Sequence, residues 1–523
     1  MDQKKSIKKL VMHGGILAFA GIIVRVIGLI YRIPMLNIIG DKAYGIYSTA
    51  FNVYNFMLVL SSYGLPMAIS KLVSDRLAQK HYKDAKKIFV SSMIIATCSG
   101  GIAALFTYFG AEFIEKNFYA GYEGIAIPLK VLAPTIFIVS MLGVFRGFFQ
   151  GQGTTIPTAI SQVIEQIINA LVSILAGYLL VAKYKESRRL AGYGAAGGTM
   201  GTAFGAFAAL IVLVVIYMAV RPVFEKKIRR DRYSVNEPYG DIIKIIVATM
   251  IPIILGQTFY QISATLDDIM FGKLMLGAGI SKATIQRAVG NYSSSYVILT
   301  GVVMGVASAM SASMLPSIVA SKARREYEEI NEKIKVTVQT NMFVAIPSFV
   351  GLVVLGEPII KLLFPRLNSN QGGIMLKIGA IAVVFYTIST VTSSALQGID
   401  KMNVPVKHSS ISLVIHVFIV YVLLKFTDLG IYAIVIGSTT FPIVIMLLNL
   451  LSLNRYIGYT QEITKTFFIP LLSSLVMGIG CVITYDIIYA VTKINMISLM
   501  FAFIVAGVLY FGCMIMFKKK KFY

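Results

Sequence analysis

Long apolar segments recur along the whole chain, and short polar connectors separate them. A helix that crosses the hydrocarbon core of a bilayer needs about 20 consecutive, mostly apolar residues. Fourteen segments meet this requirement. Their approximate limits are 10–33, 44–70, 88–109, 127–149, 157–181, 195–220, 242–270, 291–317, 335–356, 372–397, 407–425, 429–453, 466–489 and 496–517. The pattern predicts an all-α membrane protein with about 14 transmembrane helices and no separate soluble domain.

Two arginines interrupt the first of these segments. Arg25 lies deep in it and Arg32 lies near its far end, and this spacing brings them onto nearly one face of a helix. An arginine near the bilayer centre costs about 2.5–3.5 kcal/mol. We therefore interpret Arg25 as facing a water-filled cavity. Arg32 has two interpretations, since its side chain can either join Arg25 or reach the interface as an anchor.

Other segments carry polar side chains at helical spacing. The second segment contains Asn52 and Asn55, the fifth contains Glu165, and the seventh contains Gln261 and Asp268. Such stripes arise either from hydrogen bonds between helices, worth about 0.6–2 kcal/mol each, or from the lining of a cavity. For Glu165 and Asp268 both interpretations stay open, because a buried carboxylate can also neutralise an arginine or remain protonated.

Glycines at regular spacing mark the sixth segment. Gly197, Gly201 and Gly205 follow one another at four-residue intervals. Small residues at this spacing leave a flat helix face that lets a neighbouring backbone approach closely. The sequence therefore predicts tight helix packing along this segment.

The chain also repeats itself. The turn QGQGTTIP, from Gln150, resembles QGIDKMNVP, from Gln397, at an offset of 247 residues, and Tyr82 and Tyr327 lie in similar charged connectors at an offset of 245. Two nearly equal offsets indicate a duplicated six-helix unit, and parallel repeats of this kind are typical of transporters with a site at the repeat interface. The predicted parts are an N-terminal lobe, 1–220; a cytoplasmic linker, 221–241; a C-terminal lobe, 242–455; and two additional helices with a basic tail, 456–523.

Composition and charge fit a protein embedded in a membrane. The chain is 57% hydrophobic and only 14% charged, with a formal net charge of +24 and a mean hydropathy of +0.77. With fourteen spans, 31 lysines and arginines fall on the side of the two termini and 16 on the opposite side. The positive-inside rule then places both termini in the cytoplasm, in a multi-pass protein of the cell membrane. It also explains the basic charge without a nucleic-acid partner.

Motifs for enzymatic chemistry are not found in the sequence. It contains no GxxxxGK[ST] phosphate loop, and no serine, histidine and aspartate set or paired carboxylates at a defensible spacing. The cysteines Cys98, Cys481 and Cys513 lie in predicted spans and form neither a disulfide framework nor a metal motif. We expect no enzyme activity, no cofactor and no metal.

The sign of the buried charge points to the class of substrate. A guanidinium in the wall of a cavity attracts anions and repels cations, and it pairs well with phosphate oxygens. Arg25 therefore favours a substrate that bears a phosphate or pyrophosphate. The same charge disfavours a cationic drug.

Several long stretches resemble a known family. They are RVIGLIYRIPMLNIIG, AYGIYSTAFNVYNFMLVLSSYGLPMAISKLVS and the two repeated turns quoted above. They resemble the multidrug/oligosaccharidyl-lipid/polysaccharide (MOP) exporter superfamily, in the branch that holds stage V sporulation protein B and the MurJ-type lipid II flippases. The resemblance implies two pseudo-symmetric six-helix lobes around a central cavity, plus two C-terminal helices.

The resemblance also implies a mode of action. Related flippases alternate between inward-open and outward-open states and move a lipid-linked sugar pyrophosphate to the outer leaflet. The headgroup passes through the cavity, while the lipid tail follows a groove near the last two helices. The family's cavity arginine on the first helix falls on Arg25. The corresponding arginine on the second helix is replaced by Leu58.

We therefore expect a flippase for a lipid-linked sugar pyrophosphate, the peptidoglycan precursor lipid II, with membrane lipids and a monovalent cation as further partners. The substrate-binding candidates are Arg25, Arg32, Asn52, Asn55 and Gln261, and the ion-coupling or cavity carboxylates are Glu165 and Asp268. The alternatives are a flippase for another lipid-linked polysaccharide unit, a cation-coupled multidrug antiporter of the same fold, and a non-transporting membrane scaffold for wall synthesis.

Overall fold

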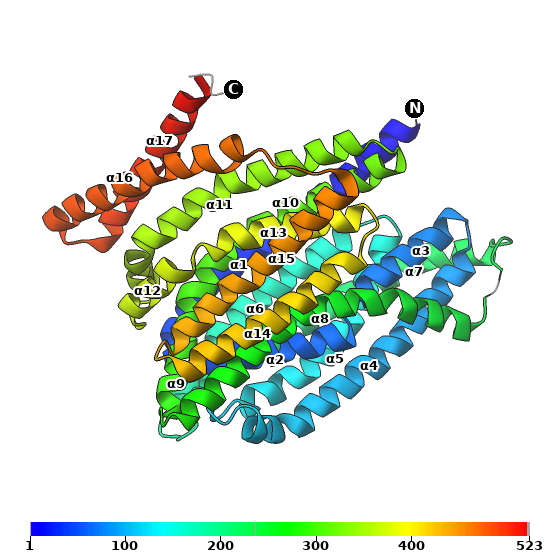
Figure 1. Cartoon of the computed structure of the whole chain (residues 1–523). Coiled ribbons are helices and arrows are strands. Elements are labelled where there is room, and N and C mark those ends of the chain that lie inside the picture. The colour runs from blue at the N-terminus through cyan, green and yellow to red at the C-terminus, as the bar shows by residue number, and fades with distance from the viewer. Residues whose placement is uncertain (1, 236, 520–523) are drawn as a thin grey trace. The chain divides into compact units, whose positions relative to one another are not determined.

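The computed structural model describes residues 2–235 and 237–519, and within them all regular structure is helical. Contacts along the chain divide it into two compact units, one up to Arg287 and one from Ala288 onward. The first unit contains α1 (Asp2–Ile39), α2 (Asp41–Ser61), α3 (Leu65–Ala78), α4 (Tyr82–Asn117), α5 (Ala126–Gly151), α6 (Ile156–Lys183), α7 (Leu190–Arg229), α8 (Tyr239–Gly277) and the start of α9 (Lys282–Asn291). These helices are labelled in Figure 1.

The second unit holds the rest of the chain. Its elements are the π-helix η1 (Tyr292–Val297), α10 (Ile298–Ala323), α11 (Tyr327–Leu363), α12 (Ser369–Gly379), α13 (Ala382–Gly398), α14 (Asn403–Phe426), α15 (Ile431–Ile457), the π-helix η2 (Thr464–Phe468), α16 (Ile469–Thr492) and α17 (Asn495–Lys519). The boundary between these two units, after Arg287, differs from the predicted boundary between the two repeats. The predicted repeat boundaries describe an ancestral duplication rather than packing, and they stay a prediction.

The predicted spans correspond to helices. In the described part of the chain, 12 helices are long and apolar enough to cross a membrane, and the bent pair α12 and α13 makes a thirteenth. These match the second to the fourteenth predicted segments in order, and the first predicted segment lies within the continuous helix α1. The prediction of an all-α membrane protein is therefore confirmed.

Two of the predicted spans are interrupted, the first at a proline within the span and the second at a contact with another helix. The second segment breaks between Ser61 and Leu65, where Pro66 stands in the first turn of α3 and cannot donate a helical hydrogen bond. The tenth bends by 48° between α12 and α13. There the Tyr296 hydroxyl donates to the carbonyl of Gly379 at 3.0 Å. It thus occupies a carbonyl that would otherwise accept a hydrogen bond within the helix.

The helix α6 packs closely along α7 within the first unit. A Cβ atom added to Gly201 would lie 2.0 Å from Ser173 Oγ, and one added to Gly197 would lie 2.6 Å from the Cα atom of Gly177. Only glycine fits at these distances. The predicted packing face is therefore present, and it holds α6 at a fixed position beside α7.

The linker after α7 is pinned to the first unit by two buried aspartates. Asp231 accepts hydrogen bonds from the backbone of Lys83, Tyr233 and Ser234 and from the Ser234 hydroxyl. Asp84 accepts from the backbone of Val235. Burial alone raises the pKa of Asp231, but these hydrogen bonds outweigh it and hold the pKa well below its usual range.

The last two helices form an antiparallel pair on the second unit (Figure 1). The pair packs on α11, where the Tyr510 hydroxyl donates to the carbonyl of Phe343 at 2.8 Å. Val350 and Leu355 of α11 share an apolar cluster with Met477 of α16.

Candidate functional site

The arginine stripe lies on α1 as predicted. Arg25, Gly28 and Arg32 follow at helical spacing, and the stripe passes α6 at Gly28, where a Cβ atom would lie 3.3 Å from Gln166 Nε2. Arg25 is exposed on the surface of the first unit, whereas Arg32 is half-buried. Arg25 therefore lies at the exposed surface of α1, and Arg32, two turns further along, lies in partly enclosed surroundings.

Arg32 lies among tyrosines of α1 and α2. Tyr31, Tyr44 and Tyr47 surround its guanidinium, and all three are buried. Arg32 Nε is enclosed and makes no hydrogen bond of standard geometry among the described residues, while Tyr31 interacts with both the Arg32 guanidinium and the Tyr47 hydroxyl. Buried polar groups are almost always satisfied, so Arg32 Nε has unused capacity to bind a water molecule or an anion.

Two predicted residues from different helices come together. Asn52 Nδ2, on α2, donates to Asp268 Oδ2, on α8, at 2.8 Å, and both residues belong to the first unit. The Tyr122 hydroxyl donates to the Asp268 carbonyl at 3.1 Å and fixes the backbone there. The fully buried hydroxyl of Thr49, one turn from Asn52, faces the Asp268 carboxyl and the Tyr122 hydroxyl.

Asp268 has no cationic partner within ion-pair distance among the residues that the structure describes. Its exposed fraction is 7%, and the neighbouring Asp267 is equally buried. A carboxylate at such a place must bind a proton or a cation to avoid an uncompensated buried charge. The arrangement is therefore able to take up one positive charge.

Glu165 has a partner that the sequence analysis missed. Arg146 of α5 binds Glu165 of α6 at 2.7 Å and donates through Nε to Ser161 Oγ at 3.1 Å. The two charged side chains are only 16% and 25% exposed. The signal was present in the sequence, because α5 and α6 are antiparallel neighbours joined by the QGQGTTIP turn, and each carries one charge near that turn.

The structure gives fewer contacts for the two remaining candidates, Asn55 and Gln261. Asn55 and Gln261 are half-buried on α2 and α8. The Gln261 carbonyl accepts from the Thr265 hydroxyl at 3.4 Å. No hydrogen bond joins either side chain to Arg25 or Arg32 in the described ranges, so their role in a substrate path stays a prediction. No group of three or more potential metal ligands is found there either.

Comparison with known proteins identifies the family. Residues 10–322 match the polysaccharide biosynthesis protein family. The chain belongs to this family. The matched region contains all seven predicted site residues. Residues 252–422 also match the MatE family.

Curated relatives of this polysaccharide biosynthesis protein extend over most of its length. The lipid II flippase MurJ of Bacillus subtilis (strain 168) is 25% identical over 506 residues, which cover 90% of this chain and 88% of the relative. Stage V sporulation protein B of the same organism is 21% identical over 458 residues, or 86% of this chain and 84% of the relative. The expected resemblance to stage V sporulation protein B and the MurJ-type flippases is therefore confirmed.

Solved structures share the fold of the family member described here. A lipid II flippase MurJ in an inward closed conformation aligns with a TM-score of 0.67 at 16% identity, over 96% of this chain and 99% of that one. An inward-facing multidrug resistance MATE family transporter of the MOP superfamily aligns with a TM-score of 0.61 at 17% identity, over 83% and 98%. The chain is a multi-pass membrane protein with the MOP fold.

Proposed function

We propose that the protein is a flippase that moves a lipid-linked sugar pyrophosphate, the peptidoglycan precursor lipid II, from the inner to the outer leaflet. The observation that carries the proposal is the pair of arginines on α1, one of which has an enclosed Nε without a hydrogen-bond partner. Guanidinium donors of this kind fit phosphate oxygens. The similarity to a lipid II flippase over most of the chain supports the same substrate class.

In this proposal Arg25 meets the pyrophosphate first, since it is exposed, and Arg32 then binds it with its enclosed Nε. The neighbouring Tyr47 hydroxyl supplies a further hydrogen bond. Asn55 and Gln261 line the path of the sugar. Leu58 stands where related flippases carry an arginine, so in this proposal the positive charge that binds the headgroup comes from α1, without a second arginine on α2.

Coupling to an ion rests on the Asp268 carboxyl. Taking up one proton or one monovalent cation there removes a buried negative charge between α2 and α8. Occupancy of this site would favour one arrangement of these helices over another and so drive alternating access. Glu165 is held by Arg146 and contributes to the position of α6 rather than to coupling.

Reconstitution tests the flippase directly. Proteoliposomes are loaded with labelled lipid-linked precursor, and its appearance in the outer leaflet is followed for wild type, Arg25→Ala, Arg32→Ala and the surface control Arg188→Ala, whose side chain is 89% exposed. Hydrogen bonds to charged groups are worth about 1.5–3 kcal/mol, so each α1 variant should lose about tenfold or more in rate. Arg188→Ala should keep the wild-type rate.

A second function is a cation-coupled antiporter, which the MatE match over residues 252–422 favours. The same proteoliposomes decide between the two. Efflux of a cationic dye, together with precursor flipping that is unchanged in folded Arg25→Ala and Arg32→Ala proteins, would replace the flippase by the antiporter. If neither substrate is moved, the scaffold alternative takes the place of both.

A further inference from the structure

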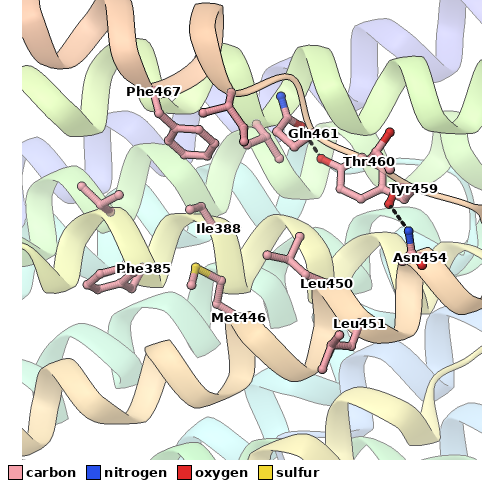
Figure 2. A pocket seen from close by; sticks show the side chains of 13 residues that line it. Phe385, Ile388, Met446, Leu450, Leu451, Asn454, Tyr459, Thr460, Gln461 and Phe467 are labelled. Carbon is pink, nitrogen blue, oxygen red and sulfur yellow. Dashed lines mark hydrogen bonds between the residues drawn. The ribbon is translucent and has the colours of Figure 1, made fainter.

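The second unit contains an apolar cavity that the proposed function does not use. Its volume is about 610 Å³, and it lies between α11, α13, α15 and the segment that leads into η2. Figure 2 shows Phe467 of η2 on one side, with Phe385 of α13 and Met446 of α15 on the other. Leu450 and Ile388 complete the wall. We call this space the η2 cavity.

The polar side chains beside the η2 cavity form hydrogen bonds with groups of the same segment. Asn454 Nδ2 donates to the Tyr459 carbonyl at 3.1 Å, the Tyr459 hydroxyl donates to Gln461 Oε1, and Gln461 Nε2 donates to Thr466 Oγ1 at 2.7 Å. Burial raises the pKa of the Tyr459 hydroxyl, so it stays protonated and keeps donating. With these groups satisfied, the cavity offers a hydrocarbon wall and suits a hydrocarbon ligand.

The mouth of the cavity is apolar as well. Leu451 and Ile463 line it and are 68% and 70% exposed. Large apolar side chains exposed at the mouth of a cavity in a membrane protein lie against lipid. A lipid chain therefore reaches the cavity from the bilayer without crossing a polar layer.

Basic residues lie in the segments that flank the cavity lining. Arg455 is exposed next to Asn454, and Lys401 is exposed with its Nζ atom 4.9 Å from the centre of the Tyr456 ring. Lys465 follows Ile463 after one residue, and the only acidic residue between 455 and 467 is Glu462, whose Oε2 accepts from the Lys465 backbone at 2.6 Å. Arg455 and Lys465 outnumber Glu462 in this segment, and Lys401 adds a third cation beside Asp400, which pairs with Lys322. The resulting positive charge complements an anionic headgroup, as basic segments beside a membrane do.

We propose that the η2 cavity binds one acyl chain of an anionic phospholipid, with the headgroup between Lys401, Arg455 and Lys465. The lipid fastens the start of α16 to α11, α13 and α15, and so ties the last two helices to the rest of the second unit. It is a resident lipid and not the transported one. A volume of about 610 Å³ lies within the range of small-ligand pockets and suits a single acyl chain, not the much longer tail of a polyprenyl lipid.

Native mass spectrometry of the delipidated full-length protein tests the proposal with phosphatidylglycerol and phosphatidylcholine of identical chains. Leu450→Trp fills the cavity, and Leu447→Trp places the same bulk on an exposed position of α15. Wild type and Leu447→Trp should bind phosphatidylglycerol at least tenfold more tightly than phosphatidylcholine. Leu450→Trp should lose this binding.

A charge variant keeps the test valid if the tryptophan variant misfolds. Arg455→Gln with Lys465→Gln removes two of the three charges without adding bulk and should reduce phosphatidylglycerol binding to the phosphatidylcholine level. Equal binding of the two lipids by wild type, or undiminished binding by folded Leu450→Trp, would overturn the proposal. Displacement of bound phosphatidylglycerol by an equimolar polyprenyl pyrophosphate would also overturn it, since the cavity would then belong to the transported lipid.

Discussion

The ion pair between Arg146 and Glu165 allows a quantitative test of how the first unit is held together. Removing one partner of a fully buried pair costs about 3–5 kcal/mol, because the other charge is left uncompensated. Here the Arg146 and Glu165 side chains are 16% and 25% exposed, so the pair is not fully buried. We therefore expect Glu165→Leu and Arg146→Met each to destabilise the protein by about 2–3 kcal/mol.

The double variant should behave differently from the sum of the two single variants. Replacing both charges by apolar side chains of similar size removes the desolvation penalty together with the attraction, so its cost should be below about 1 kcal/mol. Independent effects would add to about 4–6 kcal/mol. The difference is the coupling energy of the pair.

Fluorescence-detected size-exclusion chromatography of a fluorescent-protein fusion after heating measures this series in detergent, and the fusion supplies the signal because the chain contains no tryptophan. The surface pair of Lys130 and Glu112 is a matched control, since the distance is also 2.7 Å but the side chains are 39% and 76% exposed. Its variants should change stability by less than about 1 kcal/mol. A double variant of Arg146 and Glu165 that is as unstable as the summed single variants would refute the reasoning.

Three further predictions follow from the described contacts. Gly201→Val should prevent α6 from packing on α7 and lower the heating midpoint markedly, whereas Gly507→Val, with no atom near its Cβ position, should not. Asp231→Asn should destabilise the protein by about 1–2 kcal/mol at pH 7. Because the folded pKa of Asp231 is lowered, its contribution is present above about pH 4 and is lost as the pH falls further, so the difference from wild type should shrink when heating is repeated at pH 3.5. Asn52→Leu should remove the amide donor to the Asp268 carboxyl and lower the free energy of unfolding by about 1–3 kcal/mol, measured in the same assay, and this loss should be absent in Asn52→Leu/Asp268→Leu.

The sequence was sufficient to predict the spans because hydrocarbon imposes their length and polarity directly. It did not predict where helices break. Pro66 is a visible signal for the end of α2, but the bend at Gly379 depends on the Tyr296 hydroxyl, which comes from another helix 83 residues earlier in the chain. Such tertiary hydrogen bonds leave no local pattern.

Only part of the candidate site was predicted, because contacts between side chains of different helices leave no local pattern in the sequence. Costly residues such as Arg25 and Asp268 stand out in an apolar segment, since each needs a physical explanation. Their partners depend on the side chains that other helices bring beside them. Asn52 was selected for its own spacing and only the fold joins it to Asp268, while Arg146 was overlooked because it lies near the end of a span, where charge is common.

The central claim is that guanidinium groups on α1 bind the phosphate of a lipid-linked substrate. The most direct test is the affinity of the purified protein for a polyprenyl pyrophosphate and for the uncharged polyprenol with the same tail, in wild type and in Arg25→Ala/Arg32→Ala. The account predicts that wild type binds the pyrophosphate at least tenfold more tightly than the alcohol and that the double variant binds the two alike. Equal preference in wild type and double variant would contradict it.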